Sequence, residues 1–142
     1  MGTGWILSSV PPLTFPRLSP SATIGAEVMP MRLAKYHFGT IEVDGVAYEH
    51  DLLITPTTVQ EWQRREGHRV HPEDLEPALV VSPDVVVVGM GFSGLLTLTE
   101  EARARLAERK IELIAVRTGE AVEAYNELSP ARRTCALLHL TC

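Results

Sequence analysis

Apolar side chains alternate with polar ones between residues 36 and 62, which is the pattern of β-strands. FGTIEV leads into Asp44-Gly45, a strong signal for a two-residue hairpin turn. The next run, VAYEHDLLI, is expected to place four apolar side chains on one face, namely Val46, Tyr48, Leu52 and Ile54. TTVQEW predicts a third short strand that ends at Trp62, an expected core anchor. The N-terminal side of the fold is therefore expected to contain a β-hairpin.

The pattern changes to a β-α-β unit in the second half of the chain. DVVVV is apolar without interruption, as in a strand that helices cover on both faces. Thr99 is the expected N-cap of the following helix, and Thr118 is the expected cap of a second one, GEAVEAYNEL. IELIAV and TCALLHLTC are the remaining strands, and PEDLEPALV is a short helix that Pro77 and Pro83 are expected to bound. The fold class is α/β.

Residues 1–31 differ from the rest of the chain. They contain five prolines and few charges, which predicts an irregular or disordered tail. The length of 142 residues favours one domain, so residues 32–142 are expected to form it. Met29 and Met31 lie at the junction, and we hypothesise that translation of the native protein starts there, downstream of Met1.

Composition and charge narrow the range of partners and compartments. A net charge of -5 argues against nucleic acid or an anionic membrane as the main partner, because both attract a basic face. The most apolar run, residues 85–96, is shorter than the roughly 18 residues that a transmembrane span needs. Two cysteines do not make a disulfide framework, so a reducing, cytoplasmic location is expected.

GMGFSG, from Gly89 to Gly94, has the spacing of a dinucleotide-binding turn, G-x-G-x-x-G, directly after a strand. Such a turn also needs a helix that opens at its third glycine and an acidic residue after the next strand. Here the helix starts only after Thr99, and Arg117 follows the strand. Only one of the three conditions is met, so a nicotinamide or flavin oxidoreductase is the least favoured function.

Two other interpretations of the glycine run stay open. It can be a tight strand exit where backbone passes close to backbone, or its amides can form a nest for a small anion. The run and Thr118 follow neighbouring parallel strands at the edge where such sheets bind ligands. The candidate ligand- or anion-binding residues are Gly89, Met90, Gly91, Phe92, Ser93, Gly94 and Thr118. No cofactor, metal ion or catalytic residue is predicted.

The other polar residues that we considered have simpler structural explanations. His68, His71 and Asp74 carry zinc-ligand side chains, but they cross a loop-to-helix junction and lack a fourth partner, so a solvated loop is expected. On an extended strand His139 and Cys142 would face opposite sides.

Cys135 and His139 would share one face of that strand. A Cys-His nucleophile pair is conceivable there, but no residue is expected to orient the histidine, so a packed histidine is favoured. The length of the extended segment between Cys135 and Cys142 argues against a disulfide between them.

Four motifs together resemble the Mth938-like domain family over residues 32–142. They are W-x-R-x-x-G-H from Trp62, P-D-x-x-x-x-G-x-G from Pro83, T-x-E-A-x-x-x-Y-N-x-L from Thr118, and H-L-T-C from His139. The resemblance implies a three-layer α/β fold with a mixed central sheet and about three helices around it. The sequence departs from the family pattern in its proline-rich tail and at Met90, where members often carry Thr or Arg.

The resemblance implies no established catalysis. Relatives include a mitochondrial assembly factor for respiratory complex I and a protein linked to adipogenesis, so a mitochondrial location is the alternative for a eukaryotic source. The first hypothesis is a non-enzymatic binding or assembly module, a monomer or weak homodimer, whose partner is an unidentified protein or small ligand. The second is a small-molecule or anion-binding enzyme with its site at Gly89–Gly94.

Overall fold

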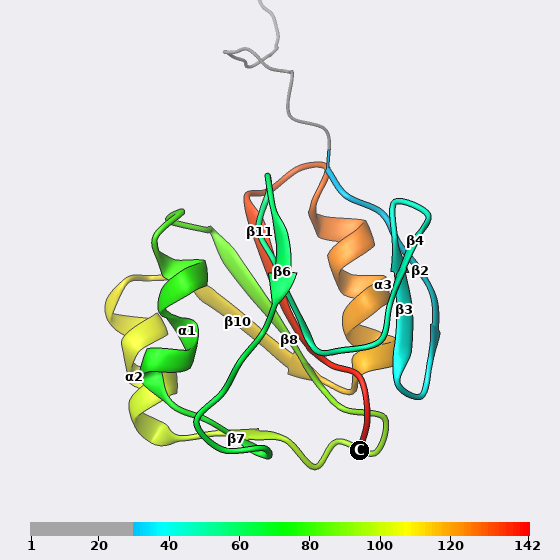
Figure 1. Ribbon diagram of the computed structural model, residues 1–142. Coiled ribbons are helices and arrows are strands. Elements are labelled where there is room, and N and C mark those ends of the chain that lie inside the picture. Colours follow the sequence, from blue (N-terminus) through cyan, green and yellow to red (C-terminus); the bar gives the residue numbers. More distant parts are fainter. Residues whose placement is uncertain (1–29) are drawn as a thin grey trace, which may run out of the picture. The chain divides into compact units, whose positions relative to one another are not determined.

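The four-valine run forms β8 in a mixed five-stranded sheet (Figure 1). The computed structural model describes residues 30–142, so the tail predicted for residues 1–31 lies almost wholly outside the described residues. β10 and β11 flank β8 and run parallel to it, whereas β5 pairs antiparallel with β11 and β6 antiparallel with β5. In spatial order the strands are β10 (Glu112–Val116), β8 (Val85–Met90), β11 (Thr134–His139), β5 (Leu52–Ile54) and β6 (Val59–Glu61).

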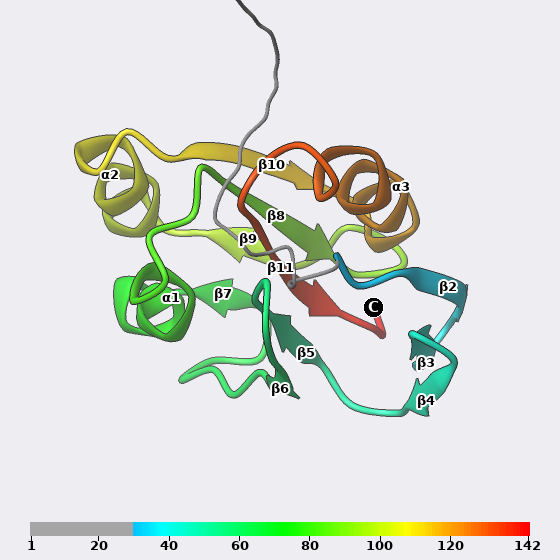
Figure 2. The same ribbon diagram turned by 90° about the horizontal axis from the view of Figure 1, so that it is seen from above.

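Different elements cover the two faces of this sheet (Figure 2). One face packs against α1 (Pro72–Leu79) and α2 (Glu100–Glu108). The other packs against α3 (Thr118–Leu128) and a three-stranded antiparallel sheet. That small sheet consists of β2 (Leu33–His37), β3 (Thr40–Val43) and β4 (Val46–Tyr48). The predicted three-layer α/β fold with a mixed sheet, an N-terminal hairpin and three helices is confirmed.

Burial follows the alternation of side chains along the two central strands. Val86 and Val88 of β8 contribute to the core under α1 and α2, while Val87 belongs to the core under α3. β11 is divided in the same way, and every one of its residues is buried because it lies between β8 and β5. Apolar residues on both faces are the physical reason why these strands occupy the centre.

The predicted hairpin is present, but the run after it divides between two sheets. Asp44 and Gly45 both have positive φ, 51° and 84°, and Val43 pairs with Val46 across the two-residue turn. The expectation that VAYEHDLLI continues with one apolar face is wrong. β4 ends at Tyr48 and the chain crosses to β5 in the central sheet, which leaves Val46 exposed on the edge of the small sheet.

Two of the three helices begin or end differently from the prediction. The Thr99 cap of α2 is confirmed, since its Oγ1 accepts a hydrogen bond of 3.0 Å from the Ala102 amide. Pro77 lies inside α1 and does not bound it. A proline has no amide to donate to the carbonyl four residues earlier, and the exposed position of Pro77 lets water solvate that carbonyl. Thr118 is the first residue of α3, whose N-cap is Arg117.

A short parallel pair, β7 (Arg69–Val70) and β9 (Thr97–Leu98), joins the segments before α1 and α2. β9 separates the glycine run from α2, as the late helix start predicted. Among residues 30–142, the helices are too short or too polar for any of them to cross a membrane.

Candidate functional site

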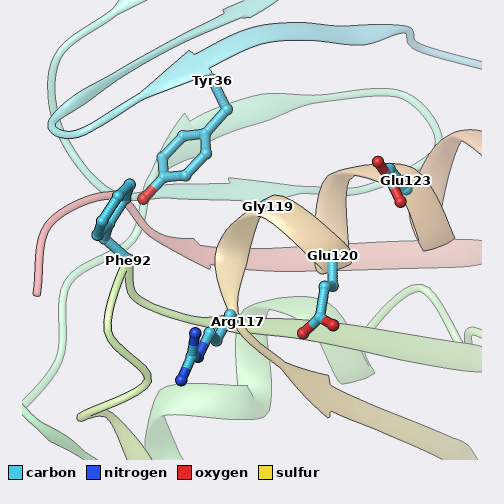
Figure 3. A pocket seen from close by; sticks show the side chains of 6 residues that line it. All are labelled: Tyr36, Phe92, Arg117, Gly119, Glu120 and Glu123. Atoms are coloured by element: carbon cyan, nitrogen blue, oxygen red, sulfur yellow. The ribbon is translucent and has the colours of Figure 1, made fainter.

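A pocket of about 440 Å³ lies beside the glycine run, at the N-terminal end of α3 (Figure 3). Tyr36 reaches it from β2, Phe92 from the loop after β8, and the other lining residues belong to the start of α3. Figure 3 shows the rings of Tyr36 and Phe92 close to each other at one end. The full lining is Tyr36, Phe92, Arg117, Gly119, Glu120 and Glu123.

Backbone amides in the glycine run and directly after it donate to acceptors within the chain. Gly91 donates to Oγ1 of Thr118 at 2.9 Å, and Phe92 donates to the Thr141 carbonyl at 2.7 Å. Leu95 donates to the Cys142 carbonyl at 3.2 Å. These three donors therefore already have acceptors within the chain. This arrangement agrees with the interpretation that the run lets two backbone segments approach closely.

Gly91 is the point of closest approach. Its φ is +100°, and a Cβ placed on it would lie 2.5 Å from the carbonyl carbon and oxygen of Cys142. Gly89 has a similar constraint, since its Cβ would lie 2.8 Å from Oγ1 of Thr118. Only glycine fits at these two positions without moving the backbone or side chain that it touches.

Thr118 connects three elements through one hydroxyl. It is fully buried, accepts from the Gly91 amide, and donates to the His139 carbonyl at 2.5 Å. Thr118 therefore lies next to the glycine run, as expected, although it does not cap α3. Of the seven predicted ligand-binding residues, Phe92 lines the pocket.

Exposed apolar side chains adjoin this pocket at Phe92. Phe38 is 57% exposed and Phe92 56%, and their rings are in edge-to-face contact with centroids 5.9 Å apart. Leu95, in the same loop as Phe92, is 55% exposed. We call Phe38, Phe92 and Leu95 the aromatic surface.

A polar network that the sequence did not predict lies under the loop after β6. Oδ2 of Asp51 is 2.7 Å from Nδ1 of His139 and 2.8 Å from Nη1 of Arg64, and Oδ1 accepts from the Leu140 amide at 2.8 Å. Burial raises the pKa of the Asp51 carboxyl, but hydrogen bonds from His139, the Leu140 amide and Arg64 outweigh it and lower that pKa to about 2. The carboxylate is therefore ionised, and the expectation that no residue orients His139 is wrong.

Arg64 links this network by a hydrogen bond to the loop that carries His68. Its Nη2 donates to the Gly67 carbonyl at 2.8 Å, and its guanidinium carbon lies 4.5 Å from the ring centroid of Trp62. Trp62 itself is buried, as expected of a core anchor. Trp62, Arg64, Gly67 and His68 all belong to the W-x-R-x-x-G-H motif, so the motif was the signal that could have located the network.

His68, His139 and Cys142 come together at the end of β11. One ligand atom of each lies within 4.8 Å of the others, and Sγ of Cys142 is 3.4 Å from Nε2 of His68. The expectation that His139 and Cys142 face opposite sides is wrong, because β11 ends at His139 and strand alternation does not extend to Cys142. His71 and Asp74 do not belong to this group, and the expectation of a solvated loop is wrong for them, because both are buried at the start of α1, where the Asp74 carboxylate accepts from the His71 amide at 2.8 Å.

Cys135 is separate from this chemistry. It is buried between the central sheet and α1, with Sγ 3.9 Å from the Ala78 carbonyl oxygen. Burial raises the pKa of its thiol to about 11. Both cysteines are free.

Comparison with known proteins identifies the family. Residues 33–139 match the model described as protein of unknown function (DUF498/DUF598). The crystal structure of conserved hypothetical protein PH1505 from Pyrococcus horikoshii OT3 is 31% identical, with a TM-score of 0.74 over 79% of this chain and 100% of that chain.

Two less similar structures share the fold. A Bordetella pertussis protein described as a Mth938-like domain is 21% identical, with a TM-score of 0.65 over 84% of this chain and 90% of that one. A Bartonella henselae protein described as an outer membrane protein is 24% identical, with a TM-score of 0.70 over 81% of this chain and 98% of that one. The chain belongs to the DUF498/DUF598 family of unknown function and has the fold of its Mth938-like domains.

Proposed function

We propose that this protein works by binding another protein, as an assembly-type module, through the aromatic surface and the adjoining pocket. The observation that carries the proposal is the exposed pair Phe38 and Phe92, which come from distant segments and meet in edge-to-face contact. Leu95, in the same loop as Phe92, is a further exposed apolar side chain.

Isolated exposed apolar residues are ordinary, whereas a cluster beside a cavity is typical of interaction sites. Aromatic side chains are enriched at protein interfaces and often supply most of the binding energy. The pocket beside the cluster would receive one anchoring side chain of the partner. Because Glu120 and Glu123 line it together with the cation Arg117, the preferred anchor is apolar with a basic neighbour.

A photo-crosslinking amino acid at position 92 tests this proposal in cells. We expect one discrete adduct from position 92, which disappears when Phe38→Ser and Leu95→Ser are combined with it. The matched control is the same crosslinker at Val80, which is 75% exposed but lies at the end of α1. Adducts that are equally abundant from both positions, or that persist in the double variant, would contradict the proposal.

The second candidate is an enzyme that binds a small molecule or anion in the same pocket. Its volume of about 440 Å³ is in the range of small-molecule sites, and Arg117 supplies a cation. A dinucleotide is the least favoured ligand, since the amides of Gly91, Phe92 and Leu95 already donate within the chain. Calorimetric titration with phosphate, NAD(H), NADP(H) and FAD separates the candidates, and micromolar binding that Arg117→Ala abolishes would favour the enzyme.

A further inference from the structure

We propose that His68, His139 and Cys142 form a zinc-binding site, with Asp51 as the residue that orients His139. The three ligands come from different parts of the fold: the loop after β6, the last residue of β11, and the segment that follows β11. Imidazole nitrogen and thiolate sulfur are the donors that zinc prefers, and Mg²⁺ and Ca²⁺ prefer oxygen.

The spacing of the ligand atoms suits a tetrahedral ion. With Zn–S of about 2.3 Å and Zn–N of about 2.0–2.1 Å, a tetrahedral angle separates sulfur from nitrogen by roughly 3.6 Å. Sγ of Cys142 and Nε2 of His68 are already 3.4 Å apart. The third ligand atom, a ring nitrogen of His139, lies within 4.8 Å of both, so rotation of the side chains would let the three ligands close around an ion.

The tautomer of His139 leaves a nitrogen free for the ion. The Asp51 carboxylate lies 2.7 Å from Nδ1 of His139, so the hydrogen between them is on Nδ1. In the neutral ring Nε2 then keeps its lone pair. This nitrogen is buried and, among the described residues, has no hydrogen-bond partner. A buried imidazole whose other nitrogen donates to a carboxylate is the usual arrangement of a metal-binding histidine.

The glycine run holds the third ligand in place. The amides of Phe92 and Leu95 bind the carbonyls of Thr141 and Cys142, and the missing Cβ of Gly91 allows that contact. The Leu140 amide is bound by Asp51, the same residue that orients His139. The segment that carries Cys142 is therefore fixed on both sides before any ion binds.

Cys142 is the ligand that can offset the charge of an ion at this site. Asp51 and Arg64 form an ion pair in which the two charges cancel. A Cys142 thiolate would then neutralise half of the charge of Zn²⁺. Three protein ligands leave the fourth tetrahedral position for water or for a donor atom of a bound molecule.

Metal binding to the full chain, first stripped with a chelator, tests the proposal. We expect one Zn²⁺ per chain after desalting, and Co²⁺ loading is expected to give a thiolate-to-cobalt charge-transfer band. The chain has two cysteines in all, so comparing this band between Cys142→Ser and Cys135→Ala identifies which cysteine supplies the thiolate. The band should vanish in Cys142→Ser and persist in Cys135→Ala.

Affinity measurements on the exposed ligand His68 reduce the risk that the variant fails to fold. His68→Gln is expected to weaken zinc binding at least ten-fold, whereas the control His37→Gln, an exposed histidine on β2, should leave it unchanged. Asp51→Asn should weaken it about 10- to 100-fold by loosening His139. Zinc retention below 0.2 per chain, or equal affinity in Cys142→Ser and the wild-type chain, would overturn the proposal.

Discussion

Replacing Gly91 with alanine tests whether the glycine run exists to let two backbone segments meet. At Gly91, φ is +100° and an added Cβ would lie 2.5 Å from the carbonyl of Cys142 and 2.7 Å from that of Thr141. Gly94, in the same motif, has a similar φ of +80°, but its Cβ would meet only Arg117, at an ordinary contact of 3.5 Å. The two positions therefore differ in crowding and not in backbone conformation.

The expected losses of stability follow from these contacts. A left-handed backbone costs an L-residue about 1–2 kcal/mol, which applies to both variants. In Gly91→Ala the Cβ must also displace Thr141 and Cys142, and each of the two hydrogen bonds that they accept is worth about 0.5–1.5 kcal/mol. We expect the free energy of unfolding to fall by about 2–5 kcal/mol in Gly91→Ala and by about 1–2 kcal/mol in Gly94→Ala.

Urea denaturation with linear extrapolation measures both values under the same conditions. Gly119→Ala is the control, because it lies in α3 with no heavy atom within 4 Å of the added Cβ, and it should be neutral or slightly stabilising. Equal losses in Gly91→Ala and Gly94→Ala would refute the reasoning, since they would show that crowding by the 141–142 backbone adds nothing.

Three further predictions concern buried polar groups. Thr118→Val leaves the buried Gly91 amide and the buried His139 carbonyl without their partner, so the free energy of unfolding should fall by about 2–5 kcal/mol. Thr118→Ser keeps the hydroxyl and should recover most of that loss in the same urea assay. In the folded chain at pH 8, a thiol reagent should modify Cys142 and spare Cys135, because burial raises the pKa of the Cys135 thiol to about 11. Modification of both cysteines before denaturant is added would contradict this burial. Burial also raises the pKa of Tyr125 to about 12 from 10.0, so its contribution to stability is complete below pH 10 and is lost as the pH rises through 12. Tyr125→Phe should remove that part of the alkaline decline, and an unchanged decline would contradict it.

Signals confined to a few neighbouring residues predicted the fold well. Asp44-Gly45 gave the hairpin because both residues tolerate positive φ, and Thr99 gave a helix start because its hydroxyl can bind an amide of the first turn. The same local reasoning failed between Tyr48 and Leu52, where the pattern continues but the chain moves to another sheet. Periodicity records which side chains are apolar and carries no information on which strands pair.

The surroundings of His139 could not be predicted for a related reason. Alternation assigns faces only while a strand continues, and β11 stops at His139, where the next amide binds the Asp51 carboxylate. Asp51 and His139 are 88 positions apart, and no local rule connects them. Motif resemblance brought Arg64, His68, His139 and Cys142 to notice separately, but only the fold brings them together.

The internal hydrogen bonds of the glycine run limit how this edge of the sheet can bind anything. A phosphate cradle needs amides that point outward, whereas Gly91, Phe92 and Leu95 direct theirs to Thr118, Thr141 and Cys142. A phosphate could compete for them only by displacing the segment that follows β11, at the cost of about 0.5–1.5 kcal/mol for each hydrogen bond lost. Both proposals for this edge therefore rest on side chains, namely the exposed rings of Phe38 and Phe92 and the imidazoles and thiol of the proposed zinc site. In both proposals the glycines act indirectly, because their lack of a Cβ lets the loop after β8 hold the segment that follows β11.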